Sequence, residues 1–242
     1  MIKKPLRALL LSAGLGTRLR PLTLNIPKCL VSINNKPLLE NWIDALEKIN
    51  TQKLLINTHY LHEKVHQYLL TQKYREMKIY EVYEKVLSGT AGTLIENYEF
   101  FSKSVGLMIH ADNYTNLDLS NFVEAHFNRP PGCLLTMLTF NCSDPSSCGI
   151  VEVNSEKIVK NFYEKIQNPP GNLANGAAYI FEDDFLQWLI ENYQNSKDFS
   201  TEVIPNLIGK IYTYHTNMPY IDIGTLESLE KARRIKKLDD SN

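Results

Sequence analysis

Apolar and polar residues follow a repeated order over the first half of the chain, where a short apolar run is followed by a longer amphipathic run. Short apolar runs predict buried strands, and runs with apolar residues three or four positions apart predict helices. A repeated strand-then-helix order with short connections predicts a parallel sheet that helices cover on both faces. The four predicted pairs of strand and helix are 6–12 with 38–49, 53–57 with 61–70, 78–83 with 91–101, and 105–110 with 119–127.

The pattern changes after a further predicted strand at 134–140. Shorter candidates follow, namely strands at 149–153, 158–163 and 174–181, helices at 183–193 and 201–207, strands at 211–215 and 220–223, and a helix from 226. No low-complexity tract, repeat or flexible linker separates the two parts, although NPPG at 168–171 marks a sharp loop. We therefore expect one domain over 1–242, in which the later part forms a lid on the same sheet.

Composition places the chain among ordinary soluble proteins, because 43% of its 242 residues are hydrophobic and 22% are charged. The 26 basic residues nearly cancel the 27 acidic ones. A net charge of -1 gives no basic face for a nucleic acid. The apolar run near the amino terminus is far shorter than the roughly 20 residues of a membrane span, and it continues directly into a glycine loop, unlike a signal peptide. We expect a cytoplasmic protein that binds neither nucleic acid nor membrane.

Cysteine and histidine patterns do not predict a metal centre or a disulfide framework. The four cysteines show no C-x-x-C pair and no regular spacing. His62 and His66 stand four apart on a predicted helix and could together contact a metal, but no third ligand is evident. We expect both to be ordinary surface histidines.

A loop that follows the first predicted strand carries the strongest chemical signal, in the sequence LLLSAGLGTRLRPLTLNIPK at 9–28. Gly14 and Gly16 lack a Cβ atom and let backbone N–H groups approach an anion. Arg18, Arg20 and Lys28 can neutralise a triphosphate. The glycine spacing fits neither the dinucleotide fingerprint nor the P-loop, and two glycines after a strand can equally serve only to turn the chain. The basic residues favour a nucleotide.

Two aspartates end apolar runs and are candidates for a magnesium site. Asp112 follows VGLMIHA, and Asp222 lies in MPYIDIGT. Mg²⁺ prefers oxygen ligands and bridges protein carboxylates to phosphates. Each aspartate taken alone could instead cap a helix or lie in a loop.

Small residues in EKVLSGTAGTL at 84–94 precede a predicted helix. Gly89, Thr90 and Ala91 allow a base or sugar to lie against the backbone, and unpaired N–H groups at the helix start can contact its polar atoms. This signal is weak, because Ser88 and Thr90 would cap a helix in any protein.

Charged and amide side chains in the predicted lid suit a phosphorylated sugar. Lys165 could neutralise the phosphate, while Glu164 and Asn175, which precedes Gly176, could bind hydroxyl groups. The alternative is a solvated Glu-Lys pair on a strand edge.

Taken in order, these segments resemble the sugar-1-phosphate nucleotidyltransferases. The resemblance rests on the loop segment together with NNKPLLENWIDAL, HADNY, CGIVEVN, FYEK, NGAAYIF and YIDIGTLESLEKA, and it spans about residues 6 to 233. It implies a Rossmann-like three-layer α/β/α fold with a mixed, mainly parallel central sheet and a small sugar-binding lid. Residues 1–140 would mainly bind nucleotide and 141–225 mainly sugar. The implied reaction joins an NTP and a sugar 1-phosphate into an NDP-sugar and releases pyrophosphate.

The resemblance also implies roles for individual residues. Arg18, Lys28 and Asp112 would be catalytic, and Asp112 with Asp222 would hold Mg²⁺. The nucleotide would contact Leu11, Ala13, Gly14, Gly16, Thr17, Glu84, Gly89, Thr90 and Ala91. The sugar phosphate would contact Asp112, Gly149, Glu164, Lys165, Asn175 and Gly176. A homo-oligomer is compatible with the family, and a second catalytic domain is not expected.

Glu84 bears on the choice of base, since its position before GTAG resembles the hexose and heptose 1-phosphate guanylyltransferases. A carboxylate there could accept hydrogen bonds from guanine, so GTP is the expected donor. HAD at 110–112 and Ser88 depart from the usual family pattern, which leaves other nucleotides and sugars open. The alternatives are a UTP- or dTTP-dependent transferase, a phosphocholine-type cytidylyltransferase, and a non-catalytic nucleotide-sugar sensor.

Overall fold

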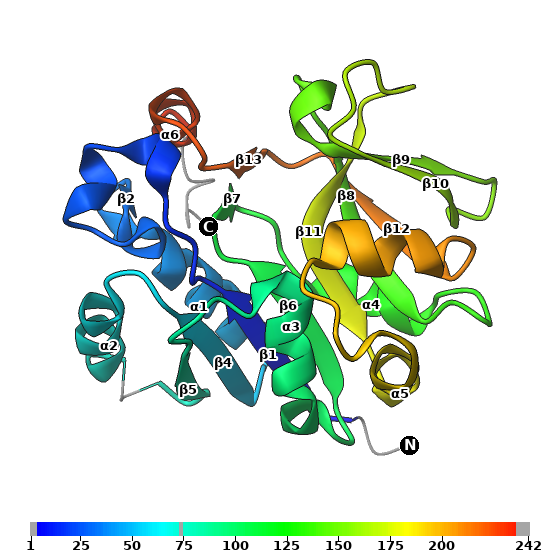
Figure 1. The fold of residues 1–242 in the computed structure, drawn as a ribbon, viewed down its shortest axis with the longest axis horizontal. Coiled ribbons are helices and arrows are strands. Elements are labelled where there is room, and N and C mark those ends of the chain that lie inside the picture. Colours follow the sequence, from blue (N-terminus) through cyan, green and yellow to red (C-terminus); the bar gives the residue numbers. More distant parts are fainter. Residues whose placement is uncertain (1–3, 73–74, 236–242) are drawn as a thin grey trace, which may run out of the picture. The chain divides into compact units, whose positions relative to one another are not determined.

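A buried strand, β1 (Leu6–Leu11), comes first in the computed structural model, which describes residues 4–72 and 75–235. The described chain divides into two compact units, and the chain passes between them several times (Figure 1). Unit 1 draws on 1–9, 88–109 and 120–217, and unit 2 on 10–87, 110–119 and 218–242. The last two residues of β1, Leu10 and Leu11, belong to unit 2. The glycine loop therefore begins in unit 2.

Unit 1 is built on a mixed sheet. Its further strands are β6 (Val105–His110), β8 (Leu135–Asn141), β9 (Gly149–Val153), β10 (Val159–Glu164), β11 (Leu173–Phe181) and β12 (Ile211–Thr216). β11 pairs antiparallel with β6, β8 and β9, and β10 pairs antiparallel with β9. β12 pairs parallel with β8. The order β10-β9-β11 places three strands that carry predicted sugar residues side by side.

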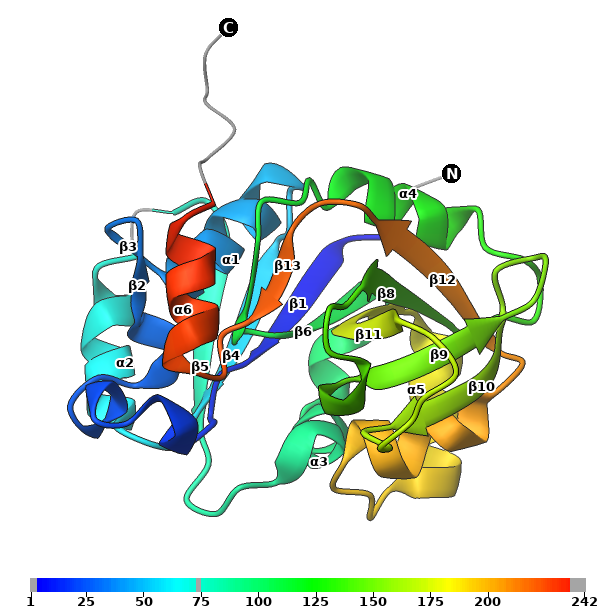
Figure 2. The same ribbon diagram turned by 90° about the horizontal axis from the view of Figure 1, so that it is seen from above.

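Helices cover both faces of this sheet. They are α3 (Gly89–Glu96), α4 (Ser120–Phe127) and α5 (Asp183–Tyr193), with short helices η4 (Tyr98–Phe101), η5 (Pro145–Ser147), η6 (Phe199–Val203) and η7 (Ile204–Leu207). Figure 2 shows α4 on one face of β8 and β11 and α5 on the other. Buried aromatic rings fill the α5 side, where Phe181 lies 5.3 Å from Phe185 and Tyr179 lies 4.8 Å from Phe199 between ring centroids. Aromatic pairs at such distances add to the free energy gained by burying their area.

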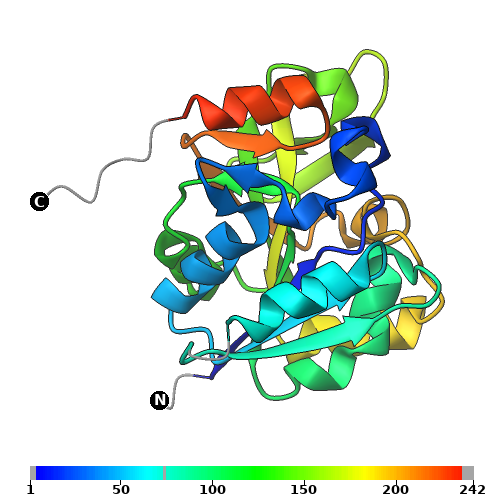
Figure 3. The same ribbon diagram turned by 90° about the vertical axis from the view of Figure 1, so that its left-hand side faces the viewer.

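Unit 2 combines a parallel strand pair with several short elements. Its strands are β2 (Ser32–Ile33), β3 (Lys36–Pro37), β4 (Lys53–Thr58), β5 (Lys78–Tyr83), β7 (Asn113–Thr115) and β13 (Tyr220–Asp222). Its helices are α1 (Leu38–Lys48), α2 (His62–Leu70), α6 (Leu226–Arg233), η1 (Thr17–Leu19), η2 (Leu22–Leu24) and η3 (Lys28–Leu30). β4 pairs parallel with β5, and β7 pairs antiparallel with β13. Figure 3 shows α6 (red) lying over β13 (orange).

One apolar cluster in unit 2 ties several of these short elements together. It contains Leu19 from η1, Val31 and Ile33 from the segment after η3, Tyr114 from β7, Ile221 and Ile223 at β13, and Leu38, Leu229 and Ala232 from helices. Burying such side chains is worth roughly 1.5–3 kcal/mol each. The loops that carry the predicted charged residues are therefore anchored to a shared core.

The predicted α/β class with a mixed sheet is confirmed, and two predicted helices are wrong in detail. The helix predicted at 91–101 is α3, which ends at Glu96, followed by the separate short helix η4. The helix predicted at 201–207 is not α-helical, because η6 has π geometry and η7 is 3-10. The short strands β2, β3 and β7 were not predicted. No helix among residues 4–72 and 75–235 is long and apolar enough to cross a membrane.

Candidate active site

The glycine loop leaves β1 and is fixed from behind by a buried threonine. Gly16 has a φ of +61°, a conformation that strongly favours glycine. The Thr23 hydroxyl donates a hydrogen bond of 2.7 Å to the carbonyl of Gly16, and a Cβ on Gly16 would lie 3.1 Å from the Thr23 methyl. Gly16 is therefore required by the fold of the loop itself.

The outer side of the loop is open. A Cβ on Gly14 would meet no atom within 4 Å, and Gly14 does not have a positive φ. Thr17 is exposed, while Leu11 is half-buried and Ala13 is buried at the base of the loop. The space beside Gly14 allows an anion to approach the backbone N–H groups.

Four charged side chains of unit 2 form an ion-pair network. The Lys28 Nζ atom lies 2.7 Å from Asp112 Oδ2 and 3.5 Å from Asp222 Oδ1. Arg18 Nη2 lies 3.6 Å from the other carboxylate oxygen of Asp222. The Lys28 side chain is only 11% exposed, whereas that of Arg18 is 67% exposed. Lys28 thus forms the buried end of the network and Arg18 its solvent end.

The Asp112 carboxyl keeps its charge in this setting. Burial alone would raise its pKa, but the Lys28 ammonium, with a smaller contribution from His110, outweighs burial and holds the pKa below its usual range. Asp112 is therefore ionised at neutral pH, as a ligand for a cation must be.

Local strand pairing explains why two aspartates 110 positions apart in sequence share one lysine. Asp222 on β13 is the register partner of Asn113 on β7, and the N–H of Ile223 donates to the carbonyl of Asp112 at 2.9 Å. Tyr114 and Ile221 anchor both strands in the apolar cluster. The pairing thus holds the backbone of both carboxylates.

The arrangement fits a magnesium ion that is bound together with a substrate. Mg²⁺ is commonly held by one or two carboxylates plus phosphate oxygens and waters. The two aspartates supply that number of carboxylates, and the charges of Lys28, Arg18 and the two aspartates sum to zero. A triphosphate would therefore need an added cation for neutralisation. Among residues 4–72 and 75–235, no group of three or more His, Cys, Asp or Glu could hold a metal by itself.

Glu84, the predicted base-recognition residue, is buried in unit 2 and held in place by its neighbours. The Asn57 side-chain amide donates to Glu84 Oε1 at 2.9 Å. The backbone N–H of Glu84 donates to Thr58, and its carbonyl lies 2.8 Å from the Nδ1 atom of His59. The orientation of this carboxylate is thus set by residues at the end of β4.

Three residues at the start of α3 pack within unit 1 more tightly than expected. Gly89 has a φ of +83°, and a Cβ there would lie 2.3 Å from the Lys197 carbonyl. The same carbonyl accepts the N–H of Ala91 at 2.9 Å. The prediction that N–H groups at the helix start are open to a ligand is therefore wrong for Ala91. The Thr90 hydroxyl oxygen accepts the N–H of Phe199 at 2.8 Å. Their role in nucleotide binding stays a prediction.

The predicted sugar-binding residues of unit 1 lie on neighbouring strands. Glu164 on β10 is the register partner of Gly149 on β9, and a Cβ on Gly149 would lie 2.6 Å from Glu164 Oε2. Lys165 has an exposed side chain and lies 3.3 Å from the Glu164 carboxylate. The structure thus brings these three residues together.

Asn175 and Gly176 lie on the adjacent strand at an irregularity in β11. The pairing of β11 with β8 shifts between Asn175 and Tyr179, which is how a bulge re-aims side chains. The Asn175 amide donates to the Tyr179 hydroxyl at 2.7 Å and accepts the N–H of Ala177 at 2.9 Å. A Cβ on Gly176 would lie 3.1 Å from the Leu138 carbonyl. The roles of these five candidates in unit 1, and that of Asp112 in sugar binding, stay predictions.

Three residues with contacts at the site were missed from the sequence. Thr23 and Asn57 act through buried side-chain hydrogen bonds. Gly224 lies against the Arg18 guanidinium, because a Cβ there would lie 2.8 Å from Arg18 Nη2. The only available signal for Gly224 was its place two residues after Asp222.

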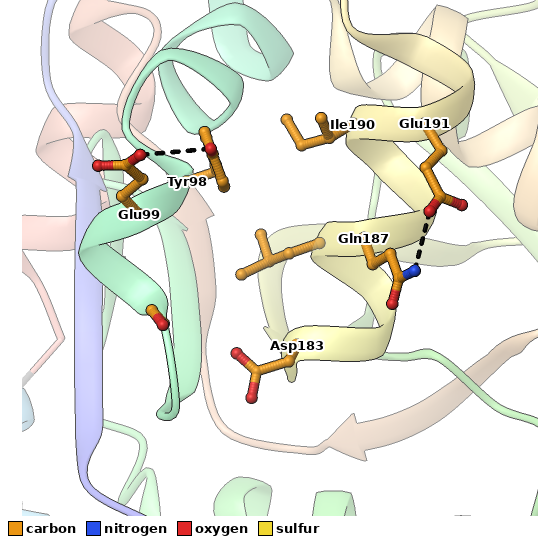
Figure 4. A pocket seen from close by; sticks show the side chains of 8 residues that line it. Tyr98, Glu99, Asp183, Gln187, Ile190 and Glu191 are labelled. Carbon is orange, nitrogen blue, oxygen red and sulfur yellow. Dashed lines mark hydrogen bonds between the residues drawn. The ribbon is translucent and has the colours of Figure 1, made fainter.

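His62 and His66 contact other side chains of unit 2, and a surface groove lies in unit 1. His62 stacks on Tyr83 with ring centroids 4.0 Å apart, and His66 Nδ1 lies 2.7 Å from Glu81 Oε2. A groove of about 720 Å³ in unit 1 separates η4 from α5 (Figure 4). Its lining residues are Tyr98, Glu99, Ser102, Asp183, Leu186, Gln187, Ile190 and Glu191, none of which is a predicted site residue.

Comparison with known proteins gives a family and a fold. A family model described as nucleotidyl transferase matches residues 7–237. A mannose-1-phosphate guanylyltransferase catalytic subunit beta from Drosophila melanogaster is 30% identical over 90% of this chain and 59% of its own length. A D-glycero-alpha-D-manno-heptose 1-phosphate guanylyltransferase from Campylobacter jejuni is 29% identical over 79% of this chain and 88% of its own length. The chain spans about half to three-fifths of several other curated relatives.

Two solved structures share the fold. A candidate glucose-1-phosphate thymidylyltransferase from Bacillus anthracis has a TM-score of 0.85 at 19% identity, with 96% of each chain covered. HddC from Yersinia pseudotuberculosis, solved with GMP-PN, has a TM-score of 0.77 at 24% identity, with 94% of this chain and 97% of that chain covered.

Proposed function

Because this chain belongs to the nucleotidyl transferase family, we propose that it transfers a nucleotidyl group from GTP to a sugar 1-phosphate and releases pyrophosphate. The observation that carries the proposal is the network of Lys28, Arg18, Asp112 and Asp222, which lies in unit 2 with the open glycine loop. The names of the mannose and heptose 1-phosphate guanylyltransferase relatives support the substrate class. The product would be an activated sugar for polysaccharide synthesis.

The chemistry needs no protein nucleophile. A phosphate oxygen of the sugar 1-phosphate attacks the α-phosphorus of the NTP, and the bond from that phosphorus to the bridging oxygen breaks. Pyrophosphate leaves with the bond electrons. Such in-line displacement depends on positioning and on neutralisation of charge. Asp112 and Asp222 would hold Mg²⁺, which would supply positive charge that neutralises the phosphates.

Lys28 and Arg18 would contribute in different ways. Lys28 is buried and fixed, so its ammonium would hold a phosphate oxygen at a set position. Arg18 is exposed, and its planar guanidinium can make two parallel hydrogen bonds to the departing pyrophosphate. Removing a donor of this kind costs about 10²–10³ in rate.

Residues of unit 1 would bind the acceptor. Lys165 would neutralise the sugar phosphate, and Glu164 with Asn175 would accept or donate hydrogen bonds to hydroxyls. The donor base would be guanine, because the Glu84 carboxylate can accept hydrogen bonds from N1–H and the 2-amino group. Uracil and thymine lack that pair of donors. A uridylyltransferase relative from Synechocystis, 25% identical, makes UTP the alternative to test.

The test is Mg²⁺-dependent pyrophosphate release with GTP, UTP, dTTP, CTP and ATP against a panel of sugar 1-phosphates and phosphocholine. Asp112→Ala is the blank, and Asp184→Asn, which changes an exposed carboxylate on α5, is the matched control. We expect release with GTP and one class of hexose or heptose 1-phosphate, at least about 10²-fold less with Asp112→Ala, and no change with Asp184→Asn.

Each other outcome assigns a different function. Release with UTP or dTTP would contradict the base assignment, and release with CTP and phosphocholine would contradict the sugar acceptor. Nucleotide binding without release from any pair would indicate a sensor in place of an enzyme.

A further inference from the structure

Asn57 is a buried amide whose two ends hold different parts of unit 2. It lies at the carboxyl end of β4 and is only 3% exposed. Its Oδ1 atom accepts the backbone N–H of Ser12 at 2.7 Å, and its Nδ2 atom donates to Glu84 Oε1 at 2.9 Å. An N–H can only donate and a carboxylate oxygen can only accept from the amide, so the orientation of the amide is chemically fixed.

A second set of contacts reinforces this link. The Ser12 hydroxyl donates to the backbone carbonyl of Asn57 at 2.5 Å, which ties the first residue of the glycine loop to β4 twice. The next residue of β4, Thr58, accepts the N–H of Glu84 at 2.8 Å. Adjacent residues of β4 therefore hold the start of the loop and both the side chain and the backbone N–H of Glu84.

We propose that Asn57 is a positioning residue that fixes the glycine loop and Glu84 relative to each other, so that binding of guanine and binding of phosphate depend on one side chain. The proposal rests on the proposed function for its choice of base. A carboxylate can accept about four hydrogen bonds. The bond from Asn57 takes one of these and restricts the rotation of the Glu84 carboxylate. Buried hydrogen-bonding groups of this kind discriminate strongly between ligands.

Inosine triphosphate is the probe that isolates this contact, because hypoxanthine differs from guanine only in lacking the 2-amino group. Binding of GTP and of inosine triphosphate with Mg²⁺ is measured by titration calorimetry without a sugar phosphate. Wild type should prefer GTP by about tenfold or more. Asn57→Asp keeps the size of the side chain and its bond to Ser12, but it replaces the Nδ2 donor that faces Glu84 with a carboxylate oxygen. The preference for GTP should then disappear.

A compensating variant distinguishes positioning from mere structure. Glu84→Gln alone should also lose the preference, because its amide would present a donor to the guanine donors. The double variant Asn57→Asp/Glu84→Gln reverses the direction of the hydrogen bond and leaves an acceptor for the base. It should regain a GTP preference within about threefold of wild type, on the scale of a single hydrogen bond. Asn41→Asp, which alters an amide of unit 2 that donates to the Pro37 carbonyl at 3.1 Å, is the control and should keep the wild-type preference.

Several outcomes would overturn the proposal. One is a folded Asn57→Asp protein that keeps the wild-type preference for GTP. Another is an equal loss of affinity for both nucleotides, together with a lower unfolding temperature, in both single variants and in the double variant. Wild type without a preference would remove the role of Glu84 and the proposal with it. A preserved GTP preference with no turnover of any sugar 1-phosphate would instead contradict the proposed function and leave the positioning role supported.

Discussion

Replacing the two glycines of the loop one at a time should separate folding from ligand binding. Gly16 has a φ of +61° and a Cβ there would lie 3.1 Å from Thr23 and 3.2 Å from Lys28. Gly14 lacks both constraints, because its φ is not positive and nothing lies within 4 Å of its Cβ position. The same chemical change, glycine to alanine, therefore meets two different environments two residues apart.

The expected magnitudes follow from these environments. A left-handed conformation costs a residue with a Cβ about 1–2 kcal/mol, and the close contacts of Gly16→Ala add about 1 kcal/mol of overpacking. Gly132→Ala, with a φ of +88° and open space, measures the conformational cost alone. Gly14→Ala should leave the free energy of unfolding unchanged or raise it by up to about 1 kcal/mol, since alanine restricts the unfolded chain.

Gly14→Ala should weaken nucleotide binding although it does not destabilise the fold. A methyl group on the open side of the loop would block hydrogen bonds from the backbone to a phosphate, each worth about 1.5–3 kcal/mol because one partner is charged. NTP affinity, measured by titration calorimetry, should fall about tenfold or more in Gly14→Ala, while chemical denaturation should show a stability equal to or slightly above that of wild type. Wild-type affinity in this variant would refute phosphate binding at the open side of the loop.

Three further predictions concern charge. Lys28→Met should lower kcat by about 10²–10³ in the pyrophosphate assay, because the variant loses the buried ammonium that contacts both carboxylates. Gly224→Ala should displace the Arg18 guanidinium and lower kcat/KM by about tenfold, with an unchanged unfolding temperature, since only a flexible side chain must move. Burial, with a smaller effect of the nearby Arg129, lowers the pKa of His126 to about 3. The free energy of unfolding should therefore fall as pH drops below 6.5, by up to about 1.4 kcal/mol per pH unit, and denaturation of His126→Phe should lose this slope.

The sequence pattern was sufficient for long elements and failed where side chains compete with the backbone. Amphipathic runs placed α1 and α5 almost to the residue. The predicted helix at 91–101 is interrupted because the Asn97 side chain donates to the Thr93 carbonyl at 2.8 Å, a local bond that favours a helix end. In 201–207, Pro205 has no N–H to continue an α-helix, and the segment adopts π and 3-10 turns instead.

Individual site residues could be predicted from the sequence, but their spatial convergence could not. Asp112 and Asp222 each drew attention by ending an apolar run, yet their convergence depends on the pairing of β7 with β13, two strands of three residues each. Strands so short leave no periodic pattern. Asn57 lies inside an apolar strand, where an asparagine has no local signal, and its contacts with Ser12 and Glu84 are tertiary.

Exposure within the charged network indicates which part of the site is rigid. Lys28 is 11% exposed, Asp112 37%, Asp222 54% and Arg18 67%. Lys28 also belongs to η3, whose following residue Val31 is packed in the apolar cluster. We therefore expect a ligand to approach from the Arg18 side and to contact a Lys28 side chain whose position is fixed. Because a guanidinium is wider than an ammonium and cannot fit the same contacts with both carboxylates, Lys28→Arg should lose activity although the charge is kept, whereas Arg18→Lys, at the solvent end, should lose less.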